Sequence, residues 1–191
     1  MNNRIKVLFL TTNFHKFEEA KKIFSNYNIS LRQIDYPKIE IQSDYLEDIV
    51  SYALKNIKVI NEPILVEDAG LFINYLNGFP GPYSSYVFKK IGNKGILKLL
   101  ENVHERNAYF MSVVGLKTRK NVIKIFKGIT YGRISRSEKG SRKFGYDPIF
   151  IPEGCSKTYA EMSINEKNKT SHRSKAFKKA IDWLINNLDN I

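Results

Sequence analysis

The spacing of hydrophobic residues at the start of the chain predicts a strand followed by a helix. Residues 5–10 form a short apolar run with β-branched members, which is typical of a buried strand. Apolar side chains then recur at helical spacing over residues 17–27. Between the two lies Thr11-Thr12-Asn13, a cluster of residue types that favour helix N-caps. The chain is therefore expected to turn at the carboxyl end of the strand and to continue as a helix to about Asn28.

The pattern farther along predicts helices and strands in alternation. Apolar positions over residues 46–57 form one helical stripe, for which Ser43 or Asp44 is the expected N-cap. Residues 63–66 are a second buried strand, which is expected to end at Glu67-Asp68. The remaining segments are a loop at 77–84, helical patterns near 85–91 and 94–103, a β-like stretch over 109–134 and a closing helix from about Ser171. This order predicts an α/β fold with a mixed sheet.

The composition favours a packed domain without cysteine-based sites. Hydrophobic residues make up 42% of the 191 residues, which is enough for a core and excludes wholesale disorder. The single cysteine, Cys155, excludes a disulfide framework and a multi-cysteine metal site. No linker rich in Gly, Ser or Pro divides the chain, so residues 1–191 are expected to form one domain. No apolar run reaches the roughly 18–20 residues of a membrane span, and we expect a cytoplasmic protein with no membrane partner.

The charge balance indicates an anionic partner. The sequence has 31 Lys and Arg against 19 Asp and Glu, a formal net charge of +12. Such a surplus suits either a nonspecific nucleic-acid-binding module or an enzyme for a small phosphorylated substrate. A nucleic-acid binder would interleave exposed aromatic residues with basic ones. Here the aromatic residues fall mostly at apolar-periodic positions, which favours the enzyme and no nucleic-acid partner.

The turn after the first strand carries side chains that suit phosphate binding. It consists of Thr11, Thr12, Asn13, Phe14, His15 and Lys16. Open α/β sheets bind ligands at such strand ends, and the N–H groups that begin a helix attract phosphate. An ordinary N-cap followed by a solvated lysine is the alternative interpretation. The sequence contains neither Gly-x4-Gly-Lys-Ser/Thr nor Gly-x-Gly-x-x-Gly, so a P-loop or dinucleotide site is not supported.

Two acidic segments are candidates for metal binding. Neighbouring strand residues point to opposite faces, so only one of Glu67 and Asp68 is expected to face a given cleft. A carboxylate at a strand end is a natural ligand for Mg²⁺, which takes oxygen ligands and keeps several waters. A carboxylate that caps the next turn is the alternative. Glu40 is a lone acidic residue at the end of a possible strand, where a surface charge is the simpler interpretation.

Two further motifs combine aromatic, carboxylate and basic groups. In Phe144-Gly145-Tyr146-Asp147-Pro148, the Phe could stack on a base while the Asp accepts hydrogen bonds from its edge. An aromatic strand that ends in an Asp-Pro turn is the alternative. Ser171-His172-Arg173 lies at the expected start of the last helix, where anions are favoured. The alternative there is a plain N-cap with solvated basic residues.

Taken together and in order, these stretches resemble the inosine triphosphate pyrophosphatase family over nearly the whole chain. The matching motifs are Thr11-Thr12-Asn13-x-x-Lys16, Glu67-Asp68-Ala69-Gly70-Leu71, Gly78-Phe79-Pro80-Gly81-Pro82-Tyr83-Ser84, Phe144-Gly145-Tyr146-Asp147-Pro148-Ile149-Phe150, Ala160-Glu161-Met162-Ser163, Glu166-Lys167-Asn168-Lys169 and Ser171-His172-Arg173. Each motif alone is weak, but so many in order at the family's spacing are highly specific.

The resemblance implies hydrolysis of ITP, XTP or dITP to the monophosphate and pyrophosphate with Mg²⁺. It also implies two lobes around a long mixed sheet, the nucleotide in a central cleft, and a homodimer. By motif, Asp68 falls at the general base and metal position, Glu40 at the second metal position and residues 11–16 at the triphosphate loop. Substrate contacts fall at Ala69, Phe144, Gly145, Tyr146, Asp147, Lys167, His172 and Arg173, and the last three are expected to donate to the O6 atom of the base.

The chain departs from the family pattern at three places. His15 stands where many relatives have Gly, and Ala69 stands where relatives often carry Ser or Thr. The segment 36–40 suggests an insertion next to Glu40. A related Maf-like pyrophosphatase of different base specificity is the alternative within the same class. The intact Phe-Gly-Tyr-Asp and Ser-His-Arg motifs argue against it.

Overall fold

The computed structural model describes residues 4–37, 39, 41–57, 61–141 and 144–187. Its centre is a seven-stranded mixed sheet in the order β2-β1-β3-β5-β6-β7, with the short β4 paired to β3. The strands are β1 (Ile5–Leu10), β2 (Ile29–Ile34), β3 (Ile64–Ile73), β4 (Pro80–Gly81), β5 (Asn107–Lys117), β6 (Ile123–Ile134) and β7 (Phe150–Pro152). β1 pairs in parallel with β2 and β3, and the other pairs are antiparallel. The predicted α/β fold with a mixed sheet is therefore confirmed.

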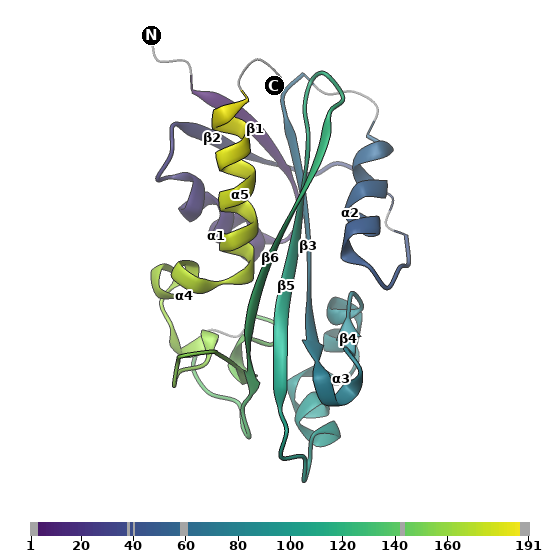
Figure 1. Ribbon diagram of the computed structural model, residues 1–191, viewed down its shortest axis with the longest axis vertical. Coiled ribbons are helices and arrows are strands. Elements are labelled where there is room, and N and C mark those ends of the chain that lie inside the picture. The colour runs from purple at the N-terminus through teal and green to yellow at the C-terminus, as the bar shows by residue number, and fades with distance from the viewer. Residues whose placement is uncertain (1–3, 38, 40, 58–60, 142–143, 188–191) are drawn as a thin grey trace.

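Helices cover both sides of the long strands. They are α1 (Phe14–Phe24), α2 (Leu46–Lys55), α3 (Ser84–Leu99), α4 (Ile164–Thr170) and α5 (His172–Asn186), with 3-10 turns η1 (Asn74–Leu76), η2 (Asp147–Ile149) and η3 (Tyr159–Glu161). In Figure 1, β3, β5 and β6 run the length of the molecule, α1 and α5 lie on one side near its upper end, and α2 lies on the other. α3, β4 and η1 lie around the lower end, and α4 lies between the two ends on the side of α5.

Three apolar clusters stabilise this arrangement. Phe9, Phe24 and Phe177 contribute to the cluster under α1 and α5, and Leu46 and Val50 to the one under α2. A third cluster at the opposite end joins α3 to β5 and to the segment around η2 and η3. The long strands thus connect two separately packed ends, which are the two lobes expected from the resemblance.

The strand that carries Glu67 and Asp68 does not end there, contrary to the sequence prediction. β3 continues to Ile73 because all ten of its residues pair with β5, whereas only Ile64–Val66 pair with β1. The two carboxylates therefore lie in the middle of a strand, directly beyond the end of β1. This is the point at which the neighbouring parallel strand stops and a ligand can approach the sheet.

Two local expectations also need correction. The N-cap of α2 is Tyr45, which makes no side-chain cap bond, rather than Ser43 or Asp44. The Ser43 hydroxyl instead accepts from the Tyr45 N–H at 3.1 Å and donates to Asp48 at 2.9 Å. The two helical patterns at 85–91 and 94–103 belong to one helix, α3, which is broken at Gly92 by a φ of +60°. That left-handed conformation favours glycine.

Candidate active site

The β1–α1 turn is an N-cap that delivers Lys16 into the molecule. The Asn13 side chain accepts from the Lys16 N–H at 3.1 Å, and the Asn13 N–H donates to the Thr11 hydroxyl at 3.1 Å. Thr11 is buried, while Thr12 and Phe14 are exposed. The capping interpretation of this turn is correct, but its lysine is not solvated: the Lys16 side chain is only 18% exposed.

Lys16 joins the two carboxylates of β3. Its Nζ lies 2.9 Å from Glu67 Oε2 and 3.5 Å from Asp68 Oδ1. Burial by itself would lower the pKa of Lys16, but the charges of Glu67 and Asp68 outweigh burial and raise it. The lysine therefore stays cationic beside Asp68, whose side chain is 29% exposed and thus accessible to a ligand.

A chain of buried ion pairs extends from Glu67 toward α4. Arg173 donates from Nε to Glu67 Oε1 at 3.0 Å and from Nη1 to Glu19 Oε2 at 2.5 Å. Lys167 lies 2.6 Å from both Glu19 Oε1 and Asp147 Oδ2. All five residues are buried. The basic residues at the start of α5 and in α4 are thus held inside the protein rather than solvated at its surface.

The charges within this chain of ion pairs determine the protonation states of its carboxyl groups. Burial would raise the pKa of Glu19, but Lys167 and Arg173 outweigh it and lower the pKa to about 2. Burial would also raise the pKa of Glu67, which Arg173 and Lys16 hold far below its usual range. For Asp147, burial outweighs the attraction of Lys167 and raises the pKa. Glu19 and Glu67 are therefore firmly anionic and act as fixed holders for the two cations.

A small cavity of about 140 Å³ opens beside this chain. It is lined by His15, Glu18, Glu19, Phe144, Asp147, Ile164 and Lys167. Phe144 is half-buried, with Lys167 Nζ 5.4 Å and Arg173 Cζ 5.8 Å from its ring centre, within the range of cation–π attraction. The cavity, between α1 and the Phe144–Asp147 segment, is therefore lined by one buried cation, three carboxylates and an aromatic surface, and a second cation, Arg173, lies next to that surface.

His172 is a buried ring that stays neutral, unlike Lys167 and Arg173, with which the resemblance groups it as a donor to the base. It stacks on Phe110 with centroids 4.6 Å apart and planes 10° apart. Burial first, and then the positive charge of Arg173, lowers its pKa well below 6.5. Within the described part of the chain, its Nδ1 has no hydrogen-bond partner. As a neutral ring, His172 can still donate one hydrogen bond.

The buried His172 should make the protein less stable in mild acid. The unfolded chain protonates this residue below about pH 6.5, while the folded protein does so only at much lower pH. The free energy of unfolding should therefore decrease as pH falls below 6.5, by up to about 1.4 kcal/mol per pH unit. Urea unfolding between pH 8 and pH 5 measures this slope. His172→Phe should flatten it, whereas His104→Gln, at an exposed histidine, should leave it unchanged; equal slopes in all three proteins would contradict the assignment.

Several predicted residues lie outside this chain of ion pairs. Tyr146 is buried in the third apolar cluster, which joins α3 to β5, and its hydroxyl donates to the Ser84 carbonyl at 3.1 Å. Gly145 has a φ of +54°, and its carbonyl accepts from Asn93 at 3.2 Å, so it shapes the turn that presents Phe144. Ala69 follows Asp68 on β3, and its N–H donates to Asp68 Oδ1 at 2.9 Å. Glu40 lies outside the described residues.

Two polar residues of the site were not predicted. Glu19 joins Lys167 to Arg173, and the Ser112 hydroxyl on β5 donates to Glu67 Oε1 at 2.7 Å. Glu19 had a detectable signal, because it shares the inward face of α1 with Ala20 and Ile23 at helical spacing. A charge on such a face needs a buried partner. Ser112 has no such signal in the sequence, because its contact with Glu67 depends on the register between β3 and β5.

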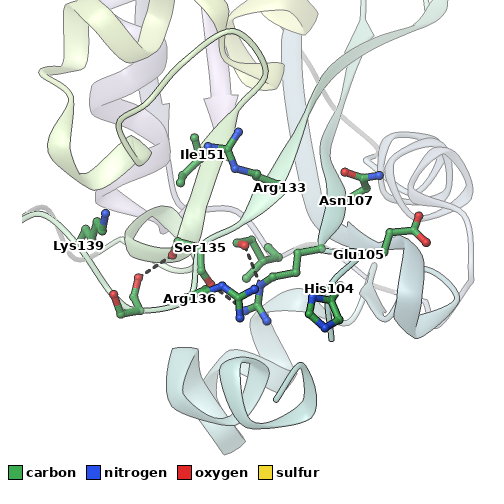
Figure 2. A pocket seen from close by; sticks show the side chains of 11 residues that line it. His104, Glu105, Asn107, Arg133, Ser135, Arg136, Lys139 and Ile151 are labelled. Carbon is green, nitrogen blue, oxygen red and sulfur yellow. Dashed lines mark hydrogen bonds between the residues drawn. The ribbon is translucent and has the colours of Figure 1, made fainter. Parts of the chain in front are cut away.

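A larger hollow of about 620 Å³ lies elsewhere, around the ends of β5, β6 and β7 (Figure 2). Arg133, Arg136 and Lys139 are among its lining residues. Arg106 is buried at its edge and donates to the carbonyls of Leu100, Ile134 and Ser135. None of the predicted site residues lines this hollow. Size alone therefore does not locate the candidate site, which is defined by its ion pairs.

Two kinds of feature are absent from the described residues. No three His, Cys, Asp or Glu side chains in those residues come together as a metal cage. No helix among them is long and apolar enough to cross a membrane.

Comparison with known proteins gives consistent matches over most of the chain. The sequence model of the Ham1 family matches residues 7–183. The dITP/XTP pyrophosphatase of Hyperthermus butylicus is 49% identical over 93% of this chain and 94% of its own length. That of Pyrococcus horikoshii is 48% identical over 96% and 99%. Among solved structures, the Staphylococcus aureus Ham1 protein superposes with a TM-score of 0.80 at 28% identity, covering 95% of this chain and 98% of its own.

Proposed function

The chain belongs to the Ham1 family, and we propose that it hydrolyses ITP, dITP and XTP to the monophosphate and pyrophosphate. The family match confirms the resemblance drawn from the sequence motifs. The similarity to the dITP/XTP pyrophosphatases of Hyperthermus butylicus and Pyrococcus horikoshii supports the proposal. The observation that carries it is the position of Lys16, which places a cation against Asp68 at the start of a helix. The cavity beside Phe144 lies one residue away, at His15.

The phosphate and base ends of a substrate would bind on opposite sides of the first turn of α1. N–H groups at the helix start and the Lys16 ammonium attract phosphate oxygens. Phe144 offers a stacking surface, and the Lys167 and Arg173 cations lie near it. We therefore propose that the nucleotide lies across the start of α1, with its triphosphate toward Asp68 and its base toward Phe144.

The residues at the phosphate end fit Mg²⁺. Asp68 is a partly exposed carboxylate, and Mg²⁺ is commonly held by one or two carboxylates, substrate phosphates and waters rather than by a protein cage. We propose Asp68 and Glu40 as its protein ligands. When bound, Mg²⁺ would neutralise phosphate charge and make the α-phosphorus more electrophilic.

Asp68 is the better candidate for general base than Glu67. Both oxygens of Glu67 are engaged, Oε1 by Ser112 and Arg173 and Oε2 by Lys16. We propose that Asp68 accepts a proton from a water that attacks the α-phosphorus, so that the α–β bond breaks and pyrophosphate leaves. Lys16 would stabilise the charge that develops on the leaving group.

Base choice is proposed to depend on donors that face the O6 acceptor of hypoxanthine and xanthine. Adenine instead carries an amino group, which is a donor, at that position. A cationic donor of the protein would then face another donor, and both groups would lose their hydrogen bonds to water. Lys167 and Arg173 can provide such donors, and neutral His172 can provide one more. A site that pairs buried polar groups can discriminate by about 10⁴–10⁵. Ala69, Gly145 and Tyr146 are proposed to act through the backbone and by shaping the turn.

Product analysis with a nucleotide panel tests the proposal. The purified protein is incubated with ITP, XTP, dITP, ATP and GTP plus Mg²⁺, and the products are separated by chromatography. We expect IMP and pyrophosphate from ITP, much slower turnover of ATP, and loss of activity with EDTA. IDP and phosphate as products would contradict the proposal, and a preference for another base would favour the Maf-like alternative. The homodimer, the single domain over residues 1–191 and the lack of a nucleic-acid partner stay predictions.

A further inference from the structure

We propose that His15 contacts the base of the substrate rather than its phosphates, as a second aromatic surface beside Phe144. This inference rests on the proposed function and concerns a position where the chain departs from the family pattern. The His15 ring lies against Phe144, with centroids 4.9 Å apart and planes inclined by 37°. It lines the same cavity as Asp147 and Lys167.

Neighbouring residues of α1 reach different ends of the site. Successive helical side chains are rotated by about 100° around the axis. Lys16 accordingly extends to Glu67 and Asp68, while His15 extends to Phe144. Although His15 belongs to the predicted phosphate loop in sequence, its ring lies at the end where the base is expected.

The geometry indicates how the ring would act. Aromatic rings in contact have centroids about 4.5–7 Å apart, so the tilted His15 ring lies in contact with Phe144. A base that stacks there must displace it. The His15 side chain is exposed and can rotate outward to cover the base from the solvent side. Phe144 would then form the inner surface of the base pocket and His15 the outer one.

This role affects affinity rather than base choice. Every base has an aromatic face, so stacking tolerates base identity and strengthens binding by about tenfold or more per base. Removal of the His15 ring should therefore weaken hypoxanthine and adenine nucleotides in equal proportion. A phosphate contact would instead strengthen pyrophosphate binding, and a contact with the base edge would alter the ratio between the two bases.

Binding of the two products separates these roles. The Kd values of IMP and of pyrophosphate are measured by calorimetry with Mg²⁺, and kcat/KM is measured for ITP and ATP. In His15→Ala we expect the Kd for IMP to rise about tenfold, the Kd for pyrophosphate to change less than twofold, and the ITP to ATP ratio to stay constant. His15→Phe should restore IMP binding. His104→Ala, at an exposed histidine away from the cavity, should behave as wild type.

The outcomes distinguish the inference from the proposed function. If the wild type neither binds IMP nor hydrolyses ITP, the proposed function is wrong and the inference is wrong with it. If the wild type does both, four results overturn the inference alone: unchanged IMP binding in His15→Ala, pyrophosphate binding weakened as much as IMP binding, a changed ITP to ATP ratio, or tighter IMP binding. The last would mean that His15 only blocks the cavity.

Discussion

Replacing Asp68 by asparagine is expected to lower kcat for ITP by about 10²-fold or more, the usual effect of removing a general base. The change keeps the size of the side chain but removes the charge that would hold Mg²⁺ and accept the proton of the attacking water. Folding should be affected far less than kcat, because asparagine keeps the shape of a side chain that is 29% exposed and lies 3.5 Å from Lys16.

Steady-state kinetics and thermal unfolding of the same preparation check this expectation. Asp182→Asn is a suitable control, because Asp182 is an exposed carboxylate on α5 outside the site. It should retain full activity. If Asp68→Asn keeps more than half of the wild-type kcat, the general base must be sought elsewhere.

The sequence predicts those parts of the fold that local pattern determines. β1 spans Ile5–Leu10 as expected, since a short apolar run before a cluster of N-cap residues leaves few alternatives. Ser171 caps α5, and its side chain accepts from the Ser174 N–H. The motifs at Lys16, Lys167 and Arg173 also point to residues that the structure brings together. The joint match of all seven motifs, in order, indicates the family without knowledge of any contact.

Features that depend on distant partners were not predictable from pattern. The length of β3 follows from its pairing with β5, which lies about forty residues later in the chain. The burial of Tyr146 and His172 follows from packing against α3 and β5. Glu19 acquires its role only because α1 packs against α5 and α4, where Arg173 and Lys167 meet it. Periodicity gives the face of a helix, but it does not identify the partner of that face.

The second large effect concerns folding. Arg173→Ala is expected to lower the free energy of unfolding by about 3–5 kcal/mol, the usual cost of removing one partner from a buried ion pair. Arg173 is 3% exposed and donates to both Glu19 and Glu67. Without it, two buried carboxylates lose the cation that they share. Arg173→Lys should lower the free energy of unfolding by less, because lysine keeps the positive charge although it cannot reproduce both guanidinium hydrogen bonds.

Urea unfolding at pH 7.5 measures the loss, and a double variant tests its cause. Glu19→Gln removes one of the two carboxylates that lose Arg173 in Arg173→Ala, while Lys167 and Lys16 still pair with Glu19 and Glu67. The double variant should therefore be less destabilised than the sum of the single variants. Strict additivity would show that lost packing, rather than the lost ion pairs, causes the effect.

The expected destabilisation also decides which variant can test the role of Arg173 in base choice. Arg173→Ala would confound recognition with unfolding, whereas a folded Arg173→Lys should narrow the ITP to ATP ratio in kcat/KM if the guanidinium donates to O6. An unchanged ITP to ATP ratio would mean that Lys167 and His172, rather than Arg173, recognise the base.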